Sequence, residues 1–423
     1  HKEYRRQRQM CIRDRGSPCA NGNFRKGPLK MPMPWRRGVT DGRNGPVAGE
    51  CDGIVTEKLL SGDGLHPKSG SLLMTLDNHT TLQNPKKTMN RTILAAAVFA
   101  ASASLNLPAA TAVNGSGATF PAPLYMRWAS DFKKSSPETT VNYQGIGSGA
   151  GVTQFIQGVT DFGASDVAMK DEEILQARHN VVMIPATAGS IVLAYNIPGI
   201  QGGVKLSRAA YIGILVGNIK NWNDAAIAKS NPGVNLPNLP ITVVTRSDGS
   251  GTTAVFTGHC AEFSAEFKDK VGSGKSVTWP VGVAGKGNDG VTALIKSTPG
   301  AIGYVEYGFA ANNKLTMADL QNKAGNFIAP SVESAATTLA SAKLPSNLRA
   351  FIFDPKGAND YPIVTFTWLL VKKSYADAAK GAAVKAFVTY GLTKGQAIAP
   401  QLGYVTLPAE VVSKAQAALE TVK

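Results

Sequence analysis

Arg246-Ser247-Asp248-Gly249-Ser250-Gly251-Thr252-Thr253 sets an arginine beside a run of small residues, between a strand-like and a helix-like segment. The β-branched residues at 241–244 predict the strand, and the residues from Thr253 onward predict the start of a helix. A helix N-terminus has unpaired N–H groups and a partial positive charge, so it can hold an oxyanion without a metal. Arg246 would add two parallel hydrogen bonds to such an anion. By itself, the stretch is equally compatible with a plain turn that caps a helix.

Two other segments repeat this arrangement of small residues followed by an amphipathic helix. Residues 115–120 lead into apolar residues spaced three and four apart, and residues 145–151 follow a β-branched, strand-like segment. Three such loops could converge on one anion. Each could instead be a glycine packing point between a strand and a helix, so the pattern leaves both interpretations open.

A fourth segment, Asp161-Phe162-Gly163-Ala164-Ser165-Asp166, brings in carboxylates. It precedes a charged segment at 170–174, so Ser165 or Asp166 could serve as a helix N-cap. The alternative places Asp166 in a pocket that otherwise consists of donors. An ionised carboxylate only accepts hydrogen bonds, so this arrangement would suit an anion that carries a proton.

Together these segments resemble, in order and spacing, the periplasmic phosphate-binding protein of ABC-type phosphate importers. The resemblance runs from about Val113 to the C-terminus. It includes residues 117–123, 141–148, 161–166, 248–252, 285–290 and 299–306.

The resemblance implies a set of phosphate-binding residues, with Asp248 orienting Arg246. Asp166 would accept the proton of phosphate. Sulfate is fully deprotonated at neutral pH and would set a bare oxygen against that carboxylate, and sites built around a substrate hydroxyl reject analogues that lack it by roughly 10⁴ to 10⁵. The implied phosphate-binding set is Thr119, Phe120, Ser148, Asp166, Arg246, Ser250, Gly251 and Thr252.

Strand-like segments that alternate with helix-like segments after residue 112 predict an α/β fold. The resemblance adds a two-lobed periplasmic-binding-protein architecture (type II, Venus-flytrap) with two hinge crossings, near 194–198 and 364–367. One lobe would comprise residues 113–194 plus 364–423. The other would comprise residues 195–363 and supply Arg246.

A signal peptide is predicted at residues 89–112. Met89-Asn90-Arg91 precedes an apolar run at 93–100, and Ala110-Thr111-Ala112 offers small residues at the cleavage positions. The apolar run is too short for a convincing membrane span. We therefore expect a periplasmic protein.

Residues 1–88 are rich in Arg, Gly, Pro and Lys and show neither helical nor strand periodicity. The peptide Gln9-Met10-Cys11-Ile12-Arg13-Asp14-Arg15 resembles a translated sequencing-library adapter. We therefore expect residues 1–88 to be a disordered, non-native upstream translation. A basic nucleic-acid-binding arm is the rival interpretation, since the chain carries a net charge of +15 and its first 112 residues supply more than half of it.

The expected function is capture of inorganic phosphate and its delivery to the membrane subunits of an ABC importer. We expect a monomer that is not an enzyme and binds no nucleic acid, cofactor or metal. His179 and His259 are not spaced for a triad or a metal cluster, and Cys260 is the only cysteine after residue 112. Two alternatives stay open: a binding protein for another tetrahedral oxyanion or phosphate ester, and a secreted phosphatase on the same scaffold.

Overall fold

The computed structural model describes residues 110–423, which all belong to one compact unit. The predictions for residues 1–88 and for most of the signal peptide lie outside the described residues. Thr111 and Ala112, which end the predicted signal peptide, are the first residues of a strand here. Among the helices between residues 110 and 423, none is long and apolar enough to span a membrane.

The described strands are β1 (Thr111–Gly117), β2 (Thr139–Gly145), β3 (Phe162–Ser165), β4 (Val181–Tyr195), β5 (Lys205–Leu206), β6 (Thr242–Arg246), β7 (Val283–Gly285), β8 (Ala301–Glu306), β9 (Thr316–Met317), β10 (Asp319–Gln321), β11 (Phe327–Ile328) and β12 (Val364–Lys372). The described helices are α3 (Ala122–Ser135), α4 (Ser148–Ile156), α5 (Asp171–Gln176), α6 (Arg208–Leu215), α7 (Ala225–Ala228), α8 (Gly251–Phe263), α9 (Ala265–Lys270), α10 (Gly287–Ser297), α11 (Tyr307–Asn312), α12 (Val332–Ser341), α13 (Ala378–Leu392) and α14 (Ala409–Glu420), with a 3₁₀ helix at Lys394–Leu402.

Nine of the described strands form one mixed sheet, in the order β2-β1-β3-β12-β4-β8-β6-β7, with β9 paired to β4. Both ends of this sheet are parallel: β1 pairs with β2 and β3 at one end, and β6 pairs with β7 and β8 at the other. The centre is antiparallel, because β12 runs against both β3 and β4, and β4 runs against β8. The predicted α/β class is confirmed.

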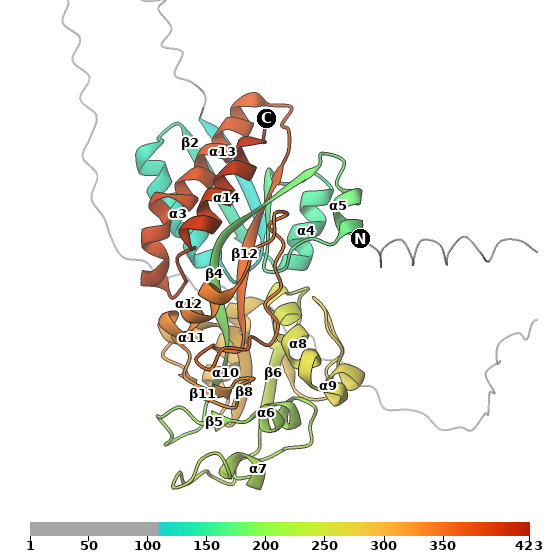
Figure 1. Cartoon of the computed structure of the whole chain (residues 1–423), viewed down its shortest axis with the longest axis vertical. Coiled ribbons are helices and arrows are strands. Elements are labelled where there is room, and N and C mark those ends of the chain that lie inside the picture. Colours follow the sequence, from blue (N-terminus) through green and yellow to red (C-terminus); the bar gives the residue numbers. More distant parts are fainter. Residues whose placement is uncertain (1–109) are drawn as a thin grey trace, which may run out of the picture. The chain divides into compact units, whose positions relative to one another are not determined.

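Strand β4, in the centre of the sheet, pairs with different neighbours along its length. Residues 181–190 pair with β12, whereas residues 191–195 pair with β8. We call β2, β1, β3, β12 and residues 181–190 the first half-sheet, and residues 191–195 with β8, β6 and β7 the second half-sheet. Figure 1 shows β4 and β12 between two groups of helices, with α3, α13 and α14 beside the first half-sheet and α6, α10 and α11 beside the second.

Helix α3 shows how the sequence pattern produces the core. Leu124, Tyr125, Trp128 and Phe132 are all buried, and their spacing places them on one face of the helix. The indole N–H of Trp128 donates to the carbonyl of Gly395 at 2.9 Å, so the one polar atom of this large buried ring is satisfied. Full burial of a leucine or phenylalanine side chain, such as Leu124 or Phe132, contributes about 1.5–3 kcal/mol.

Every parallel strand of the two half-sheets is followed by a helix. The order is β1-α3, β2-α4 and β3-α5 in the first half-sheet, and β6-α8, β7-α10 and β8-α11 in the second. A loop separates strand and helix in the first five of these pairs, whereas α11 begins directly after β8. The carboxyl ends of parallel neighbours lie on one side of a sheet, and this side is where α/β proteins bind ligands. The strand-helix connections of each half-sheet are therefore grouped at its carboxyl end.

Candidate functional site

Arg246 is the last residue of β6, and its guanidinium is held by Asp248. Nε donates to Asp248 Oδ1 at 2.8 Å and Nη2 donates to Oδ2 at 2.6 Å, while the arginine side chain is only 1% exposed. The backbone N–H of Gly287 also donates to Asp248 Oδ1, at 2.9 Å. Burial raises the pKa of Asp248, but the hydrogen bonds and charge of Arg246 outweigh it and hold the pKa below its ordinary value. The pair is a fixed cation with its own counterion.

Helix α8 begins directly after this pair. Ser250 is its N-cap, and the Ser250 hydroxyl accepts a hydrogen bond from the N–H of Thr253 at 3.0 Å. Gly251 and Thr252 form the first turn, and Thr252 Oγ1 accepts from Arg246 Nη1 at 3.3 Å. The predicted strand, loop and helix are therefore confirmed, with the helix starting two residues earlier than Thr253. The helix N-terminus and the guanidinium lie together.

Thr119 follows β1 and contacts residues of the second half-sheet. Its hydroxyl oxygen accepts from Arg246 Nη2 at 3.2 Å. Phe120, the next residue, is fully buried, and its carbonyl accepts from the Tyr404 hydroxyl at 2.7 Å. The ring of Phe120 packs against Gly189 in β4, so this residue offers a ligand its backbone rather than its side chain.

Ser148 and Asp166 form the remaining part of the predicted site. Ser148 is the first residue of α4, and its hydroxyl lies 3.4 Å from Asp166 Oδ2. Thr367 Oγ1 donates to Asp166 Oδ1 at 3.0 Å. Burial raises the pKa of Asp166 to about 7, although the Thr367 hydroxyl, the charge of Arg246 and the Ser148 hydroxyl each lower it. Asp166 therefore changes its protonation state near neutral pH.

One sequence-based alternative for the acidic segment is wrong. Helix α5 begins at Asp171, and its N-cap is Lys170 rather than Ser165 or Asp166. The Ser165 hydroxyl instead donates to the carbonyl of Val167 at 2.6 Å. Asp166 therefore does not cap a helix, and its carboxylate faces the loops that follow β2 and β6.

The loops at the carboxyl ends of the two half-sheets meet at Gly251. A methyl group there would lie 2.4 Å from Ser148 Oγ and 2.7 Å from Asp166 Oδ2, so only a hydrogen fits between α8 and the first half-sheet. Nearby, the N–H of Gly149 donates to the carbonyl of Gly249 at 2.7 Å. The structure thus brings Thr119, Ser148 and Asp166 from the carboxyl end of the first half-sheet together with the loop 246–252 of the second.

Sequence reasoning missed two residues of this cluster. Asn288 is the second residue of α10, which follows a glycine-rich connection, and its Nδ2 donates to Thr119 Oγ1 at 2.9 Å. The loop repeats the pattern of small residues before a helix, which is a usable signal. Thr367 lies in β12 beside an irregularity of pairing with β4, and nothing in the sequence around it marks that position.

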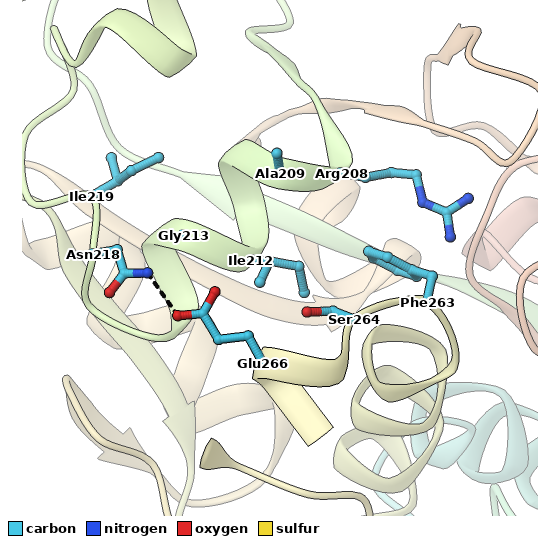
Figure 2. Close-up of a pocket in the computed structure, with 9 residues that line it drawn as sticks. All are labelled: Arg208, Ala209, Ile212, Gly213, Asn218, Ile219, Phe263, Ser264 and Glu266. Atoms are coloured by element: carbon cyan, nitrogen blue, oxygen red, sulfur yellow. Dashed lines mark hydrogen bonds between the residues drawn. The ribbon is translucent and has the colours of Figure 1, made fainter. Parts of the chain in front are cut away.

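The hollow in Figure 2 lies elsewhere, between α6 and the start of α9, and shares no residue with this cluster. At one end, Asn218 donates to Glu266 at 2.9 Å. At the other end, the Arg208 guanidinium lies 3.8 Å from the centre of the Phe263 ring and pairs with Asp354. The cation of this hollow is already matched by a buried carboxylate.

Within residues 110–423, the histidines and the cysteine form no cluster with each other or with carboxylates. No group of three His, Cys, Asp or Glu side chains in this part of the chain could hold a metal ion. Burial lowers the pKa of His259 to about 3, so this imidazole is neutral, and it lies 3.0 Å from the Tyr211 hydroxyl. Cys260 is a free, buried thiol.

Comparison with known proteins identifies the family of this chain. Residues 102–394 match the PBP superfamily domain. The phosphate-binding protein PstS of Pasteurella multocida is 44% identical over 315 residues, which cover 74% of this chain and 91% of that protein. The phosphate-binding protein PstS of Haemophilus influenzae is 41% identical, covering 72% and 91%. The chain belongs to the PstS family.

A solved structure has a similar fold. A putative phosphate ABC transporter substrate-binding protein from Clostridium perfringens, with bound phosphate, superposes with a TM-score of 0.53 at 20% identity. The match covers 70% of this chain and all of that one. At this identity the match shows the fold alone. The predicted α/β periplasmic-binding-protein fold and the predicted family are confirmed.

Proposed function

We propose that this PstS-family chain binds inorganic phosphate between its two half-sheets and delivers it to the membrane subunits of an ABC importer. One observation carries the proposal. The fixed guanidinium of Arg246 and the N-terminus of α8 lie opposite Asp166, a buried carboxyl with a pKa of about 7. A cation with a helix N-terminus attracts an anion, and a carboxylate facing them requires that the anion carry a proton.

The donors and the acceptor divide the work of recognition. Arg246, Ser148, Thr119 and the first N–H groups of α8 would donate to the bare oxygens of the anion. Asp166, when ionised, would accept from a P–OH group. Arsenate would satisfy the same pattern, whereas sulfate has no proton to donate. Phe120, Ser250, Gly251 and Thr252 would add backbone N–H or hydroxyl donors, as the family resemblance implies.

Closure of the two lobes would enclose the anion. The lobes would be residues 113–194 plus 364–423 and residues 195–363, and the change of partner along β4 after residue 190 supports a crossing close to that region. A ligand held by both lobes stabilises the closed state by its differential contacts. Closure is the change that the membrane subunits would sense.

The proposal includes a cellular setting. The chain would act in the periplasm after export by the signal peptide at 89–112, as a monomer and without chemistry of its own. Membership of the PstS family supports this setting, since the named relatives are binding proteins.

Calorimetric titration tests the proposal directly. The protein is stripped of bound anion and titrated with phosphate and, separately, with sulfate at pH 8. Phosphate binding without sulfate heat is the expected result. Binding of neither anion would overturn the proposal. Turnover of a chromogenic phosphate ester would replace it with the phosphatase alternative.

A further inference from the structure

Asn288 connects the two half-sheets through a single buried amide. It is the second residue of α10 and has no exposed surface. Its Nδ2 donates to Thr119 Oγ1 at 2.9 Å, and its backbone N–H donates to the same oxygen at 3.3 Å. On the other side, Asn288 Oδ1 accepts from the backbone N–H of Glu306 at 3.1 Å.

Glu306 fixes which way this amide faces. A backbone N–H can only donate, so the atom opposite it must be the amide oxygen of Asn288. The NH₂ group of Asn288 is then the part that faces Thr119. Because that group can only donate, the Thr119 oxygen must accept from it.

A third donor reaches the same hydroxyl oxygen, since Arg246 Nη2 lies 3.2 Å from Thr119 Oγ1. Neither the amide NH₂, nor the backbone N–H, nor the guanidinium can accept a hydrogen bond. The Thr119 hydroxyl therefore presents its lone pairs to Asn288 and Arg246, and its hydrogen must point away from them. A hydroxyl that is free to rotate could either donate to a ligand or accept from it. The Thr119 oxygen already accepts from Asn288 and Arg246, so toward a ligand this hydroxyl can only donate.

We infer that Asn288 is a positioning residue that holds the Thr119 hydroxyl as a hydrogen-bond donor to the bound anion. The inference rests on the proposed phosphate site. An anion needs donors, and a hydroxyl turned the other way would set its lone pairs against negative charge. Asn288 prevents that orientation. Thr119 follows β1 of the first half-sheet, and Asn288 follows β7 of the second. The hydroxyl therefore takes this orientation only where these two segments are in contact.

Gly287 makes the approach of α10 to Thr119 feasible. Its backbone has a positive φ of 68°, which L-residues with side chains rarely adopt. A side chain there would also start 3.3 Å from Thr119 Cγ2. A glycine thus precedes Asn288 where the helix N-terminus comes closest to the β1 loop.

A double-mutant cycle tests the inference, with phosphate affinity as its readout. Asn288→Ala should weaken phosphate binding about tenfold or more, since a hydrogen bond to a charged group is typically worth 1.5–3 kcal/mol. Thr119→Val removes the hydroxyl and keeps the shape. In that background, Asn288→Ala should change the affinity by less than about twofold. In a Thr119→Ser background, which keeps the hydroxyl, the full effect of Asn288→Ala should return.

Asn322 provides the matched control. It is also a fully buried asparagine of the described residues, and its amide donates to carbonyls at 357, 358 and 360, away from the site. Asn322→Ala should lower the melting temperature without changing phosphate affinity. If Asn288→Ala does not fold, the near-isosteric Asn288→Asp serves in the same cycle, because its carboxylate would turn the Thr119 hydroxyl inward.

Two results would overturn the inference alone: unchanged affinity in Asn288→Ala, or an equal loss in the Thr119→Val background. Either is distinct from failure of the proposed function, in which the wild-type protein itself binds no phosphate. That last outcome removes both proposals. Loss that depends on the Thr119 hydroxyl supports both.

Discussion

The carboxylate of Asp166 is contacted by the hydroxyls of Thr367 and Ser148, whereas that of Asp248 accepts two hydrogen bonds from the Arg246 guanidinium. Both aspartates lie in loops that follow strands, Asp166 directly after β3 and Asp248 two residues after the end of β6. Burial raises the pKa of Asp166 to about 7, and Arg246 holds that of Asp248 below its ordinary value. Neighbouring side chains therefore make one aspartate a permanent counterion and the other a group that gains or loses a proton.

Removing the cation would break this contrast most severely. In Arg246→Met, Asp248 loses its cationic partner and, like Asp166, keeps hydrogen bonds from uncharged groups alone. We expect phosphate affinity to fall by about 10³-fold, because two charge-assisted hydrogen bonds are lost and a carboxylate is left beside the anion. Calorimetric titration measures the change.

Arg208→Met is the control for removal of Arg246. Arg208 also pairs with a buried aspartate, Asp354, but at the hollow of Figure 2. The Arg208 variant should lose stability and keep its phosphate affinity. Equal loss of affinity in both variants would mean that general charge or folding, rather than the site, explains the result.

Asp166→Asn sharpens the comparison by removing the proton acceptor without changing the shape of the side chain. The amide can donate to an unprotonated oxygen, so selectivity for phosphate over sulfate should collapse, with sulfate affinity rising by roughly 100-fold. In the wild type, sulfate binding should improve as the pH falls below about 7, where Asp166 becomes protonated. Sulfate titrations at pH 6 and pH 8 compare the two proteins, and retained discrimination in Asp166→Asn would show that Asp166 does not select the anion.

The same variant tests the contrast without a ligand. The pKa of Asp166 is raised from 3.8 to about 7, so the folded protein holds this proton more tightly than the unfolded chain does. Its contribution to stability is present at low pH and is lost as the pH rises from about 4 to about 7. From pH 4 to pH 8, the free energy of unfolding of Asp166→Asn should therefore rise by roughly 2–4 kcal/mol relative to that of the wild type. Denaturant unfolding without phosphate measures this free energy at each pH. The prediction is contradicted if the unfolding free energies of the two proteins change in parallel with pH.

Gly251→Ala should keep the two sides of the site apart. The added methyl group would lie 2.4 Å from Ser148 Oγ, so either the half-sheets separate or the Ser148 side chain moves. Overpacking of this kind typically costs about 1–3 kcal/mol, which corresponds to a roughly 5- to 150-fold loss of phosphate affinity. Gly274→Ala, where the nearest atom is 3.5 Å away, is the control and should bind normally.

Lys275→Met should produce the smallest change. Lys275 Nζ pairs with Glu173 at 2.7 Å. This ion pair joins the loop before β7 to α5, the helix that follows β3 of the first half-sheet. Partly exposed pairs contribute about 0–1 kcal/mol, so phosphate affinity should fall by at most about fivefold, and less at high salt. Lys270→Met removes an exposed pair with Glu266 inside α9 and should have no effect. A loss that salt does not reduce would point to packing rather than charge.

The sequence predicted the parts of the site that a local pattern marks. Arg246, Asp248 and the start of α8 were predictable because small residues between a strand and a helix define a helix N-terminus. The hydrogen bond between Thr367 and Asp166 was not predictable. These residues are 201 positions apart in the chain, and they meet because β12 lies between β3 and β4. The role of Asn288 depends likewise on contact between two distant loops.

The lobe boundaries and the phosphate contacts stay predictions. The alternation of strands and helices predicted the α/β class, and the family resemblance predicted the architecture. Where β4 changes partner, after Ser190, is a matter of sheet pairing that no residue type announces. Residues 190 and 191 lie inside the part of β4, residues 183–195, that is buried throughout.

The strand order also means that some neighbouring strands are synthesised long before the strand that pairs with them. Strand β12 lies between β3 and β4, yet it is made more than 160 residues after both. Until residue 372 has emerged, the facing edges of β3 and β4 have no partner, although the intervening second half-sheet is already complete in sequence. Unpaired edges favour aggregation, and such long-range pairing slows folding. The half that holds Asp166 is therefore the one that must be kept from premature association before the chain is finished.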